Sequence, residues 1–254
     1  MKYTQLERLI EIVATLRGEN GCQWDREQTH KSLRPNMLEE AYEAVDAIDD
    51  GDIANLREEL GDVLLQVVLH AQIAKDNNEF DIEDVAKELG DKLIHRHPHV
   101  FGEKKVNSTE EILQAWEDLK KEEKTNRKSI LDGISKSQSA LMSAQKISKK
   151  VVKVGFEWDC IDSLKRCIES EYKEFDEAVL SGDQDKMEDE MGDIFFATVN
   201  LARWYKIDAE QALLRSNKKF TKRFKKMEEL ATKPFEEYSY EEFDALWKQA
   251  KKFD

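Results

Sequence analysis

The sequence predicts an all-α protein built from two tandem copies of one helical unit, and three observations support that prediction. Proline (3 residues) and glycine (10) are rare among the 254 residues, and 37% of the chain is Asp, Glu, Lys or Arg, a composition that favours helices. Hydrophobic residues make up 40% of the chain, which is adequate for a helical core. The third observation is that several motifs occur twice, in the same order.

Four pairs of matching motifs define the duplication. Three pairs share one identical separation along the chain: ELGD at 59 and EMGD at 190, ExxE at 40 and 171, and the segments STEEILQAW and SYEEFDALW that begin at 108 and 239. The fourth pair, WD at 24 and at 158, has a slightly larger separation. Between the copies, the charged run at 117–129 is a solvated helix end or a linker. We therefore predict an N-terminal unit over 1–125, a linker over 126–136 and a C-terminal unit over 137–254.

Apolar periodicity and end signals define the helices of the first unit. We expect helices over 4–17, 36–49, 53–75 and 82–97. Pro98 ends the last of them. Apolar residues have core spacing in the second helix, at Leu38, Ala41, Tyr42, Val45 and Ile48. Ser108-x-x-Glu111 and its counterpart Ser239-x-x-Glu242 are capping-box patterns, so each predicts the start of a further helix.

Charge and cysteine content exclude several classes of protein. The formal net charge is -14, so the chain repels nucleic-acid backbones and we expect no nucleic-acid partner. No apolar run approaches the roughly 20 residues that a membrane span requires, and the N-terminus is too charged for a signal peptide. Cys22, Cys160 and Cys167 form no CxxC pair, which indicates a reducing, cytoplasmic setting.

Two carboxylates lie inside the apolar helix expected over 53–75. Glu59 and Asp62 are three residues apart and share a helix face, while apolar residues cover almost the whole remaining circumference. Glu190 and Asp193 repeat this arrangement in the second unit. A helix that is apolar all round is normally buried, and a buried carboxylate must be neutralised, paired or bound to a metal.

A second acidic pair precedes each of these helices: Glu40 and Glu43 in the first unit, Glu171 and Glu174 in the second. One ExxE alone is usually a surface pair in so acidic a chain, but the duplication favours a metal site. A connection of about a dozen residues would let the two helices pack antiparallel, so that their acidic pairs converge. Oxygen ligands without nearby Cys or His select Mg²⁺ or Mn²⁺. Gly61 and Gly192 predict close approach of neighbouring helices.

Basic residues follow the acidic pairs in both units. Lys219 and Arg223 lie four residues apart on an expected helix, as do their counterparts Lys92 and Arg96. Each pair therefore shares a face that can hold a phosphate chain. A solvated basic face is the alternative interpretation of this lysine-rich segment.

The remaining residues that could take part in binding or catalysis are interpreted as structural. The HRHPH run at 95–99 is expected to cap helix carbonyls rather than to bind zinc. Cys22 is expected to be a core thiol, because no triad pattern with histidine accompanies it. Trp24 and Trp158 are expected in the core, with stacking on a base as the alternative.

Several segments together resemble the tandem-domain MazG nucleoside triphosphate pyrophosphohydrolases. These segments are GCQWDREQTH, LEEAYEAVDAI, EELGDVLLQVV, DKLIHRHPHVFG, VGFEWD, EMGDIFFATVNLAR and NKKFTKRF, and they span nearly the whole chain. The sequence departs from the family pattern at Gln23, where proline is usual. It also departs at His95, where arginine is common, and this weakens a phosphate grip in the first unit.

The resemblance implies an all-α fold in which each unit completes a four-helix-bundle-like core by homodimerisation. It also implies a nucleotide-pool housecleaning enzyme of broad base specificity that hydrolyses an NTP to NMP and pyrophosphate. The implied magnesium ligands are Glu171, Glu174, Glu190 and Asp193, with a less certain second set at Glu40, Glu43, Glu59 and Asp62.

The resemblance further assigns residues to the substrate. Lys219 and Arg223 would hold phosphates, with Lys186, Asn217 and Trp158 as further substrate contacts. In the family the second unit is the usual seat of activity. The first unit has Gly90 where the second has Asn217, so we expect the first unit to be weakly active or structural.

Two other functions are compatible with parts of the pattern. A non-catalytic dimeric adaptor would keep the acidic pairs only for packing between helices. A carboxylate-bridged di-iron oxidase would use Glu-x-x-His motifs, and this sequence has Glu or Asp where the histidine would stand.

Overall fold

The computed structural model describes residues 4–102, 108–109, 111–112, 115–116, 119 and 128–253. Over these residues the chain forms helices and irregular connections and no β-strand, as the sequence predicts. The chain divides into two compact units, Met1–Thr125 and Asn126–Asp254. No helix in the described ranges combines the length and apolar character that crossing a membrane requires. The charged run at 117–129 lies largely outside the described residues.

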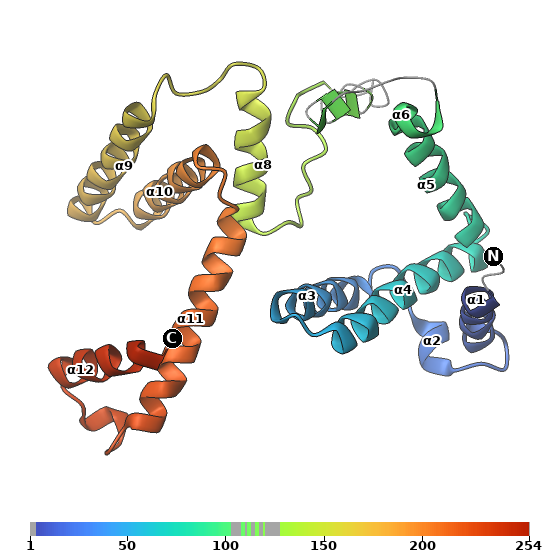
Figure 1. The fold of residues 1–254 in the computed structure, drawn as a ribbon, viewed down its shortest axis with the longest axis horizontal. Helices are drawn as coiled ribbons and strands as arrows, with labels where there is room; N and C mark the ends of the chain where they lie inside the picture. Colours follow the sequence, from blue (N-terminus) through green and yellow to red (C-terminus); the bar gives the residue numbers. More distant parts are fainter. Residues whose placement is uncertain are drawn as a thin grey trace. The chain divides into compact units, whose positions relative to one another are not determined.

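The first unit contains six described helices (Figure 1). They are α1 (Thr4–Arg17), α2 (Gln23–Glu27), α3 (Arg34–Asp50), α4 (Ile53–Asp76), α5 (Ile82–Arg96) and α6 (Pro98–Phe101). The predicted range of α1 is confirmed, and the other three long helices begin or end within two residues of their predicted ranges. Pro98 ends α5 and also begins α6, because proline suits the first position of a helix.

The second unit contains five α-helices and two short 3₁₀ helices in its described part. They are α8 (Ala140–Val152), α9 (Ile161–Ser181), α10 (Gln184–Trp204), α11 (Ala209–Leu230), η1 (Phe235–Glu237), α12 (Tyr240–Ala250) and η2 (Lys251–Phe253). The capping box predicted at Ser239 and Glu242 is confirmed at the start of α12. At its counterpart, the Glu111 amide donates to Ser108 Oγ at 3.2 Å, and most of the helix that would follow lies outside the described residues.

A tight helical hairpin is the central element of each unit. Helices α3 and α4 are joined only by Gly51 and Asp52, and α9 and α10 only by Gly182 and Asp183. Each glycine has φ +70°, a left-handed conformation that glycine adopts without strain. Each aspartate then caps the following helix, with backbone amides donating to its side chain. The connection therefore consists of one glycine and one aspartate, and the expectation of a much longer connection was wrong.

The apolar faces of the hairpins are covered only in part. The predicted core stripe of α3 is largely exposed, with Tyr42 61% and Ile48 59% accessible, whereas the small residues Ala44 and Ala47 are buried. Helix α4 is not buried all round either, because Leu60 is 53% exposed. The prediction that α4 is buried on all sides was therefore wrong within a single chain. Small side chains of α3 let α3 and α4 approach each other, and the large apolar side chains remain exposed.

Other residues expected in packed positions are also exposed. A Cβ built on Gly61 or Gly192 would meet no atom within 4 Å, so neither glycine marks a close helix contact within the chain. Cys22 is exposed just before α2 and is not a core thiol. Trp24 is 58% exposed, whereas Trp158 is partly buried.

Candidate metal centre and substrate site

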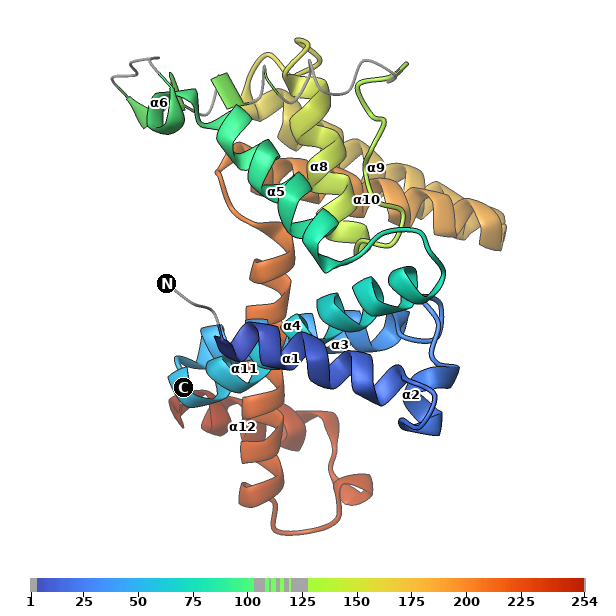
Figure 2. The same cartoon turned by 90° about the vertical axis from the view of Figure 1, so that its right-hand side faces the viewer.

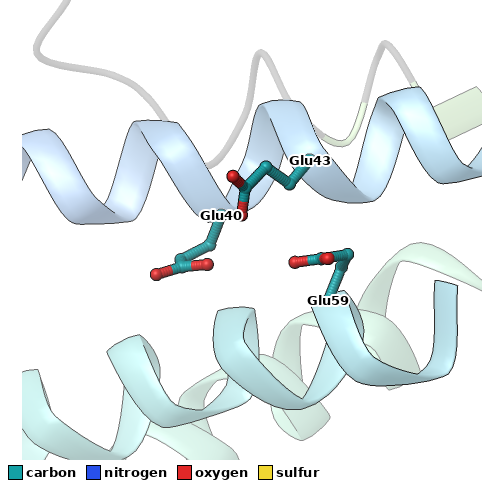
Figure 3. A group of neighbouring side chains, drawn as sticks. All are labelled: Glu40, Glu43 and Glu59. Carbon is teal, nitrogen blue, oxygen red and sulfur yellow. The ribbon is translucent and has the colours of Figure 1, made fainter. Parts of the chain in front are cut away.

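Three glutamates converge on each helical hairpin. Glu40 and Glu43 on α3 face Glu59 on α4, and one carboxylate oxygen of each lies within 4.8 Å of the others (Figure 3). The second unit repeats this cluster. One carboxylate oxygen each of Glu171 and Glu174 on α9 and of Glu190 on α10 lies within 4.8 Å of the others. We call these groups the first and second glutamate clusters; their geometry follows from the tight Gly-Asp turns, which place the helices side by side.

Asp62 and Asp193 lie outside the tight groups but close enough to act on them electrostatically. The pKa of Glu40 is raised, first by desolvation and then by the charges of Asp62 and Glu43. The pKa of Glu59 is raised by desolvation, and then by Glu43 and Asp62. Each aspartate therefore adds negative charge near its cluster without sharing the three-residue contact.

The second cluster has the same electrostatic imbalance. The pKa of Glu190 is raised by desolvation and then by the charges of Glu174, Asp193 and Glu171. Every charged neighbour that shifts this pKa is acidic. Within the described ranges, no lysine or arginine forms an ion pair with either glutamate cluster. A cation brought from solution would therefore relieve repulsion that the protein leaves in place.

The donor set of both clusters fits a hard divalent cation. All converging ligand atoms are carboxylate oxygens, which Mg²⁺ and Mn²⁺ prefer. The Cys167 thiol donates to Glu171 Oε1 at 3.5 Å, and desolvation and Glu171 raise its pKa. The thiol therefore stays protonated beside the metal-free cluster. Because Glu43 and Glu174 are exposed, an ion and a charged substrate can reach the clusters from solvent.

The predicted phosphate-binding residues lie on a different helix from the second cluster. Lys219 is exposed and Arg223 is partly buried on α11, which contacts α8, α10 and α12 but not α9 within the described unit. Figures 1 and 2 show α11 as a long helix that adjoins α8 at one end and α12 at the other. The Arg223 guanidinium lies over the Trp247 ring, 5.5 Å from its centroid. Within the second unit, Lys219 and Arg223 therefore form no ion pair with the glutamates of the second cluster.

The remaining predicted substrate residues have mixed positions. Lys186 is exposed in the first turn of α10, one turn before Glu190 and on the same face. Asn217 is exposed on α11. Trp158 is partly buried before α9, and its backbone amide donates to Glu157 Oε1 at 3.0 Å.

Sequence reasoning missed several contacts that hold the site elements in place. Arg203 on α10 forms a short ion pair with Glu157 (2.7 Å) beside Trp158, and both side chains are largely buried. The Gly-Asp pairs that form the hairpin turns, at 51 and 182, were also missed, although they repeat with the same separation as the acidic motifs. His97 Nδ1 lies 2.7 Å from the Leu93 carbonyl oxygen, so a histidine of the HRHPH run does cap the helix end.

Comparison with known proteins matches both units to one family. The MazG nucleotide pyrophosphohydrolase domain matches residues 28–101 and 160–227, segments that contain both glutamate clusters. The nucleoside triphosphate pyrophosphohydrolase/pyrophosphatase MazG of Thermotoga maritima is 45% identical over 249 residues, covering 96% of this chain and 95% of that protein. The nucleoside triphosphate pyrophosphohydrolase of Escherichia coli K12 is 42% identical over 259 residues, covering 98% and 97%.

A third relative contains the same pair of units in a longer protein. The uncharacterized protein YabN of Bacillus subtilis is 45% identical over 254 residues, covering 98% of this chain and 52% of that protein. The match at two places and the near-complete coverage of the first two relatives agree with the duplicated glutamate clusters. This chain therefore belongs to the MazG nucleotide pyrophosphohydrolase family.

Proposed function

We propose that this protein is a Mg²⁺-dependent nucleoside triphosphate pyrophosphohydrolase that converts NTP and water to NMP and pyrophosphate. The observation that supports this most directly is the duplicated glutamate cluster, which has an all-oxygen donor set and no internal cation among the described residues. The names of the two near-full-length relatives support the same reaction. Mn²⁺ is the expected substitute, because it prefers the same oxygen ligands.

The second unit is proposed to hold the metal on Glu171, Glu174 and Glu190, with Asp193 as a fourth ligand. When bound, the ion would supply charge neutralisation of the triphosphate and a lowered pKa for water. One glutamate of the cluster would accept the proton of the attacking water, since a carboxylate within hydrogen-bond reach of that water can act as a general base. The corresponding set Glu40, Glu43, Glu59 and Asp62 would be the weaker site of the first unit.

Cationic and polar side chains are proposed to hold the substrate beside the metal ligands. Lys219 and Arg223 would bind phosphate oxygens through charge-assisted hydrogen bonds. Lys186, one turn from Glu190, would contact the same phosphates, and Asn217 and Trp158 would complete the contact set. Without a base-reading constraint from these residues, we expect several NTPs to be hydrolysed, in keeping with nucleotide-pool housecleaning in the cytoplasm.

A homodimer is proposed to complete the site. The exposed apolar residues of α3 and α4, and of α9 and α10, form faces of the kind that protein interfaces cover. Phe195 is 58% exposed next to the acidic motif, and a second copy covering it would bring further side chains to the glutamate cluster. We expect Phe195→Glu to halve the molar mass measured by light scattering and to lower the hydrolysis rate; an unchanged mass would contradict the dimer at this face.

Pyrophosphate release tests the proposed activity. We expect release from NTPs with Mg²⁺, loss of release with EDTA, and a fall of at least about 100-fold for Glu190→Gln, because mutation of a metal ligand or its support removes the ion's contribution. The matched variant Glu59→Gln should retain most of the activity, because the second unit is the proposed seat of catalysis. A wild-type protein that is inactive and indifferent to Mg²⁺ would favour the adaptor function instead.

Heavy-oxygen water tests the position of attack. We propose in-line attack at the α-phosphorus, which places the oxygen of water in NMP. Hydrolysis in H₂¹⁸O followed by mass spectrometry should show the label in NMP. Label in pyrophosphate would exclude attack at this phosphorus.

A further inference from the structure

A pair of histidines joins the turn before α3 to helix α4. His30 is exposed in the 28–33 turn between α2 and α3 (Figure 1), and His70 is partly buried on α4. Their Nδ1 atoms are 2.7 Å apart. The angle between the ring planes is 1°, and the 5.0 Å between the ring centroids is nearly the sum of that gap and the radii of two imidazole rings. The rings therefore lie edge to edge in almost one plane, with the two Nδ1 atoms aimed at each other.

This geometry leaves room for one proton between the two nitrogens. A neutral imidazole donates from one ring nitrogen and accepts at the other, whereas a charged imidazole donates from both. At 2.7 Å, one Nδ1 must donate and the other must accept. The contact can thus form when both rings are neutral, and also when one ring is charged. When both rings are charged, two N–H groups and two positive charges face each other, and the contact must break.

The surroundings of His70 do not offset a second positive charge. Desolvation and then His30 lower the pKa of His70, and no described carboxylate contributes to that shift. The residue beside His30 is the exposed cation Lys31. Helices α1, α3 and α5 contact α4. The charged side chains that meet α4 from these helices or their caps do so at other positions, in the Arg17–Asp76 and Asp81–Lys75 ion pairs and in the first glutamate cluster of Glu40, Glu43 and Glu59.

The histidine pair links the 28–33 turn to α4. Within the turn, the backbone amides of Thr29 and Ser32 each donate to the other residue's side-chain oxygen, at 2.9 and 3.1 Å. From outside the turn, Arg17 donates to the Gln28 carbonyl at 3.3 Å. In the described part of the chain, the histidine contact is the turn's one side-chain hydrogen bond to α4. The turn can therefore move as a unit when that contact breaks.

Movement of this turn would reach the interior of the first unit. Leu33, at the end of the turn, is 1% exposed and packs in the core between α1 and α4. It also lines a cavity of about 220 Å³ whose wall includes Trp24, Glu40 and Gln66. Withdrawal of Leu33 would thus open the core and change the cavity beside the first glutamate cluster.

We infer that His30 and His70 form an acid-sensitive latch, which holds the 28–33 turn on α4 while the two rings share one proton and releases it when both rings are protonated. The open turn takes up a proton that the closed turn excludes. Opening therefore increases as pH falls below about 6.5, the ordinary pKa of a histidine. The inference goes beyond the proposed function, because the latch requires neither nucleotide nor metal.

The second unit has no such latch. When the units are aligned on their acidic motifs, Leu201 occupies the position of His70. From the tryptophan of WD to the first glutamate of ExxE, the chain advances 16 positions in the first unit (24 to 40) and 13 in the second (158 to 171). All five histidines belong to the first unit: His30, His70, His95, His97 and His99. The second unit is therefore an internal reference in the pH range where histidines titrate.

Hydrogen–deuterium exchange of the full chain tests the release. Exchange is followed by mass spectrometry at pH 7.5 and pH 5, with correction for the intrinsic rate at each pH. We expect the protection of the 28–33 turn to fall at least about 10-fold at the lower pH, the effect of one unit of pKa difference. Protection of α9 and α10 should not change.

His30→Asn separates the latch from packing. An asparagine amide can donate to neutral His70 and, after rotation, accept from charged His70. This variant should therefore keep the turn protected at both pH values, and the reciprocal His70→Asn should do the same. His99→Gln is the matched control, because it removes a histidine of the same unit outside the pair, and it should behave like the wild type.

An NMR titration of the histidine rings gives a readout that packing alone does not produce. His30 and His70 should titrate as one coupled pair, in two steps separated by more than about one pH unit. In His30→Asn, His70 should titrate in a single step.

Four results would overturn the inference. Equal loss of protection in the wild type and in both asparagine variants would assign the effect to other groups. Protection that persists while both rings are charged would exclude the release. Independent single-step titrations would show that the nitrogens share no proton. Simultaneous loss of protection in both units would be general unfolding. NTP hydrolysis enters none of these measurements, so the latch and the proposed function fail separately.

Discussion

The buried hydrogen bond between Ser148 and Asn200 offers the sharpest stability test of how the second unit holds its site. Ser148 on α8 is 0% exposed and Asn200 on α10 is 2% exposed, and Ser148 Oγ donates to Asn200 Oδ1 at 2.5 Å. Asn200 Nδ2 donates to the Phe196 carbonyl at 2.9 Å. The hydrogen bond between Ser148 and Asn200 fixes α8 against α10, the helix that carries Glu190. Its loss should therefore loosen the unit that is the proposed seat of catalysis.

The magnitude follows from what each substitution leaves behind. Ser148→Ala removes the donor and leaves Asn200 Oδ1 buried without a partner, which costs about 1–3 kcal/mol. Asn200→Leu leaves the Ser148 hydroxyl unsatisfied and should cost a similar amount. The double variant replaces both polar groups by apolar ones and should cost clearly less than the sum of the single variants. The first unit already carries Leu69 at the position equivalent to Asn200.

Denaturant unfolding followed by calorimetry would measure this double-mutant cycle. The relevant quantity is the free energy of the transition that belongs to the second unit, because the two units need not unfold together. A single-variant cost of about 1 kcal/mol should lower Tm by about 2–8 °C, depending on how many residues unfold as one unit. Single variants within about 0.5 kcal/mol of wild type, the range typical of surface changes, would refute the reasoning. Additive single costs in the double variant would also refute it.

Three further predictions concern the hairpins and their ionisable groups. Gly192→Ala should stabilise α10 by up to about 1 kcal/mol, because no atom lies within 4 Å of the added Cβ; a lower Tm with loss of oligomer mass would show that another copy packs there. Because the pKa of Glu190 is raised above its usual 4.5, the unfolded state loses that proton first and folding stability falls as pH rises above about 4.5. Glu190→Gln should remove that decline from the pH–Tm profile and reduce the Tm gain on adding Mg²⁺, and an unchanged profile would contradict the repulsion. The pKa of His70 is lowered by desolvation and by His30, so the unfolded state binds that proton more tightly and stability falls as pH drops below about 6.5. His70→Asn should flatten this fall in denaturation measured between pH 7.5 and 5, whereas an equally steep fall would assign it to other groups.

Local signals were sufficient for the helices and for the choice of acidic residues. The bounds of α1 and the capping box at Ser239 and Glu242 were predictable, because periodicity and end-capping depend on residues only a few positions apart. Convergence of the glutamates was also predictable, because two consecutive helices that pack antiparallel bring their acidic pairs together. The tight turn is also a local signal, because Gly51 ends α3 in a left-handed conformation and Asp52 caps the start of α4.

The side of each helix that is covered could not be read from the apolar pattern. The stripe that includes Tyr42 and Ile48 has core spacing, yet the structure buries Ala44 and Ala47 instead. An apolar stripe shows that a face avoids water, but it does not show whether the same chain or another copy covers it. The same limit explains Trp24, which was expected in the core and is instead exposed beside a cavity.

A helical, duplicated protein with acidic pairs at matched positions was predictable from the amino acids alone, because composition, periodicity and repeated motifs are properties of the chain. The packing of the helices was needed to show that three glutamates of each hairpin converge, while Lys219 and Arg223 lie on a helix that does not contact α9. Only the tertiary structure could show the unpaired oxygen of Gln66 in a cavity. The reason is that distances between side chains far apart in sequence are set by how helices pack, and neighbouring residues do not encode that packing.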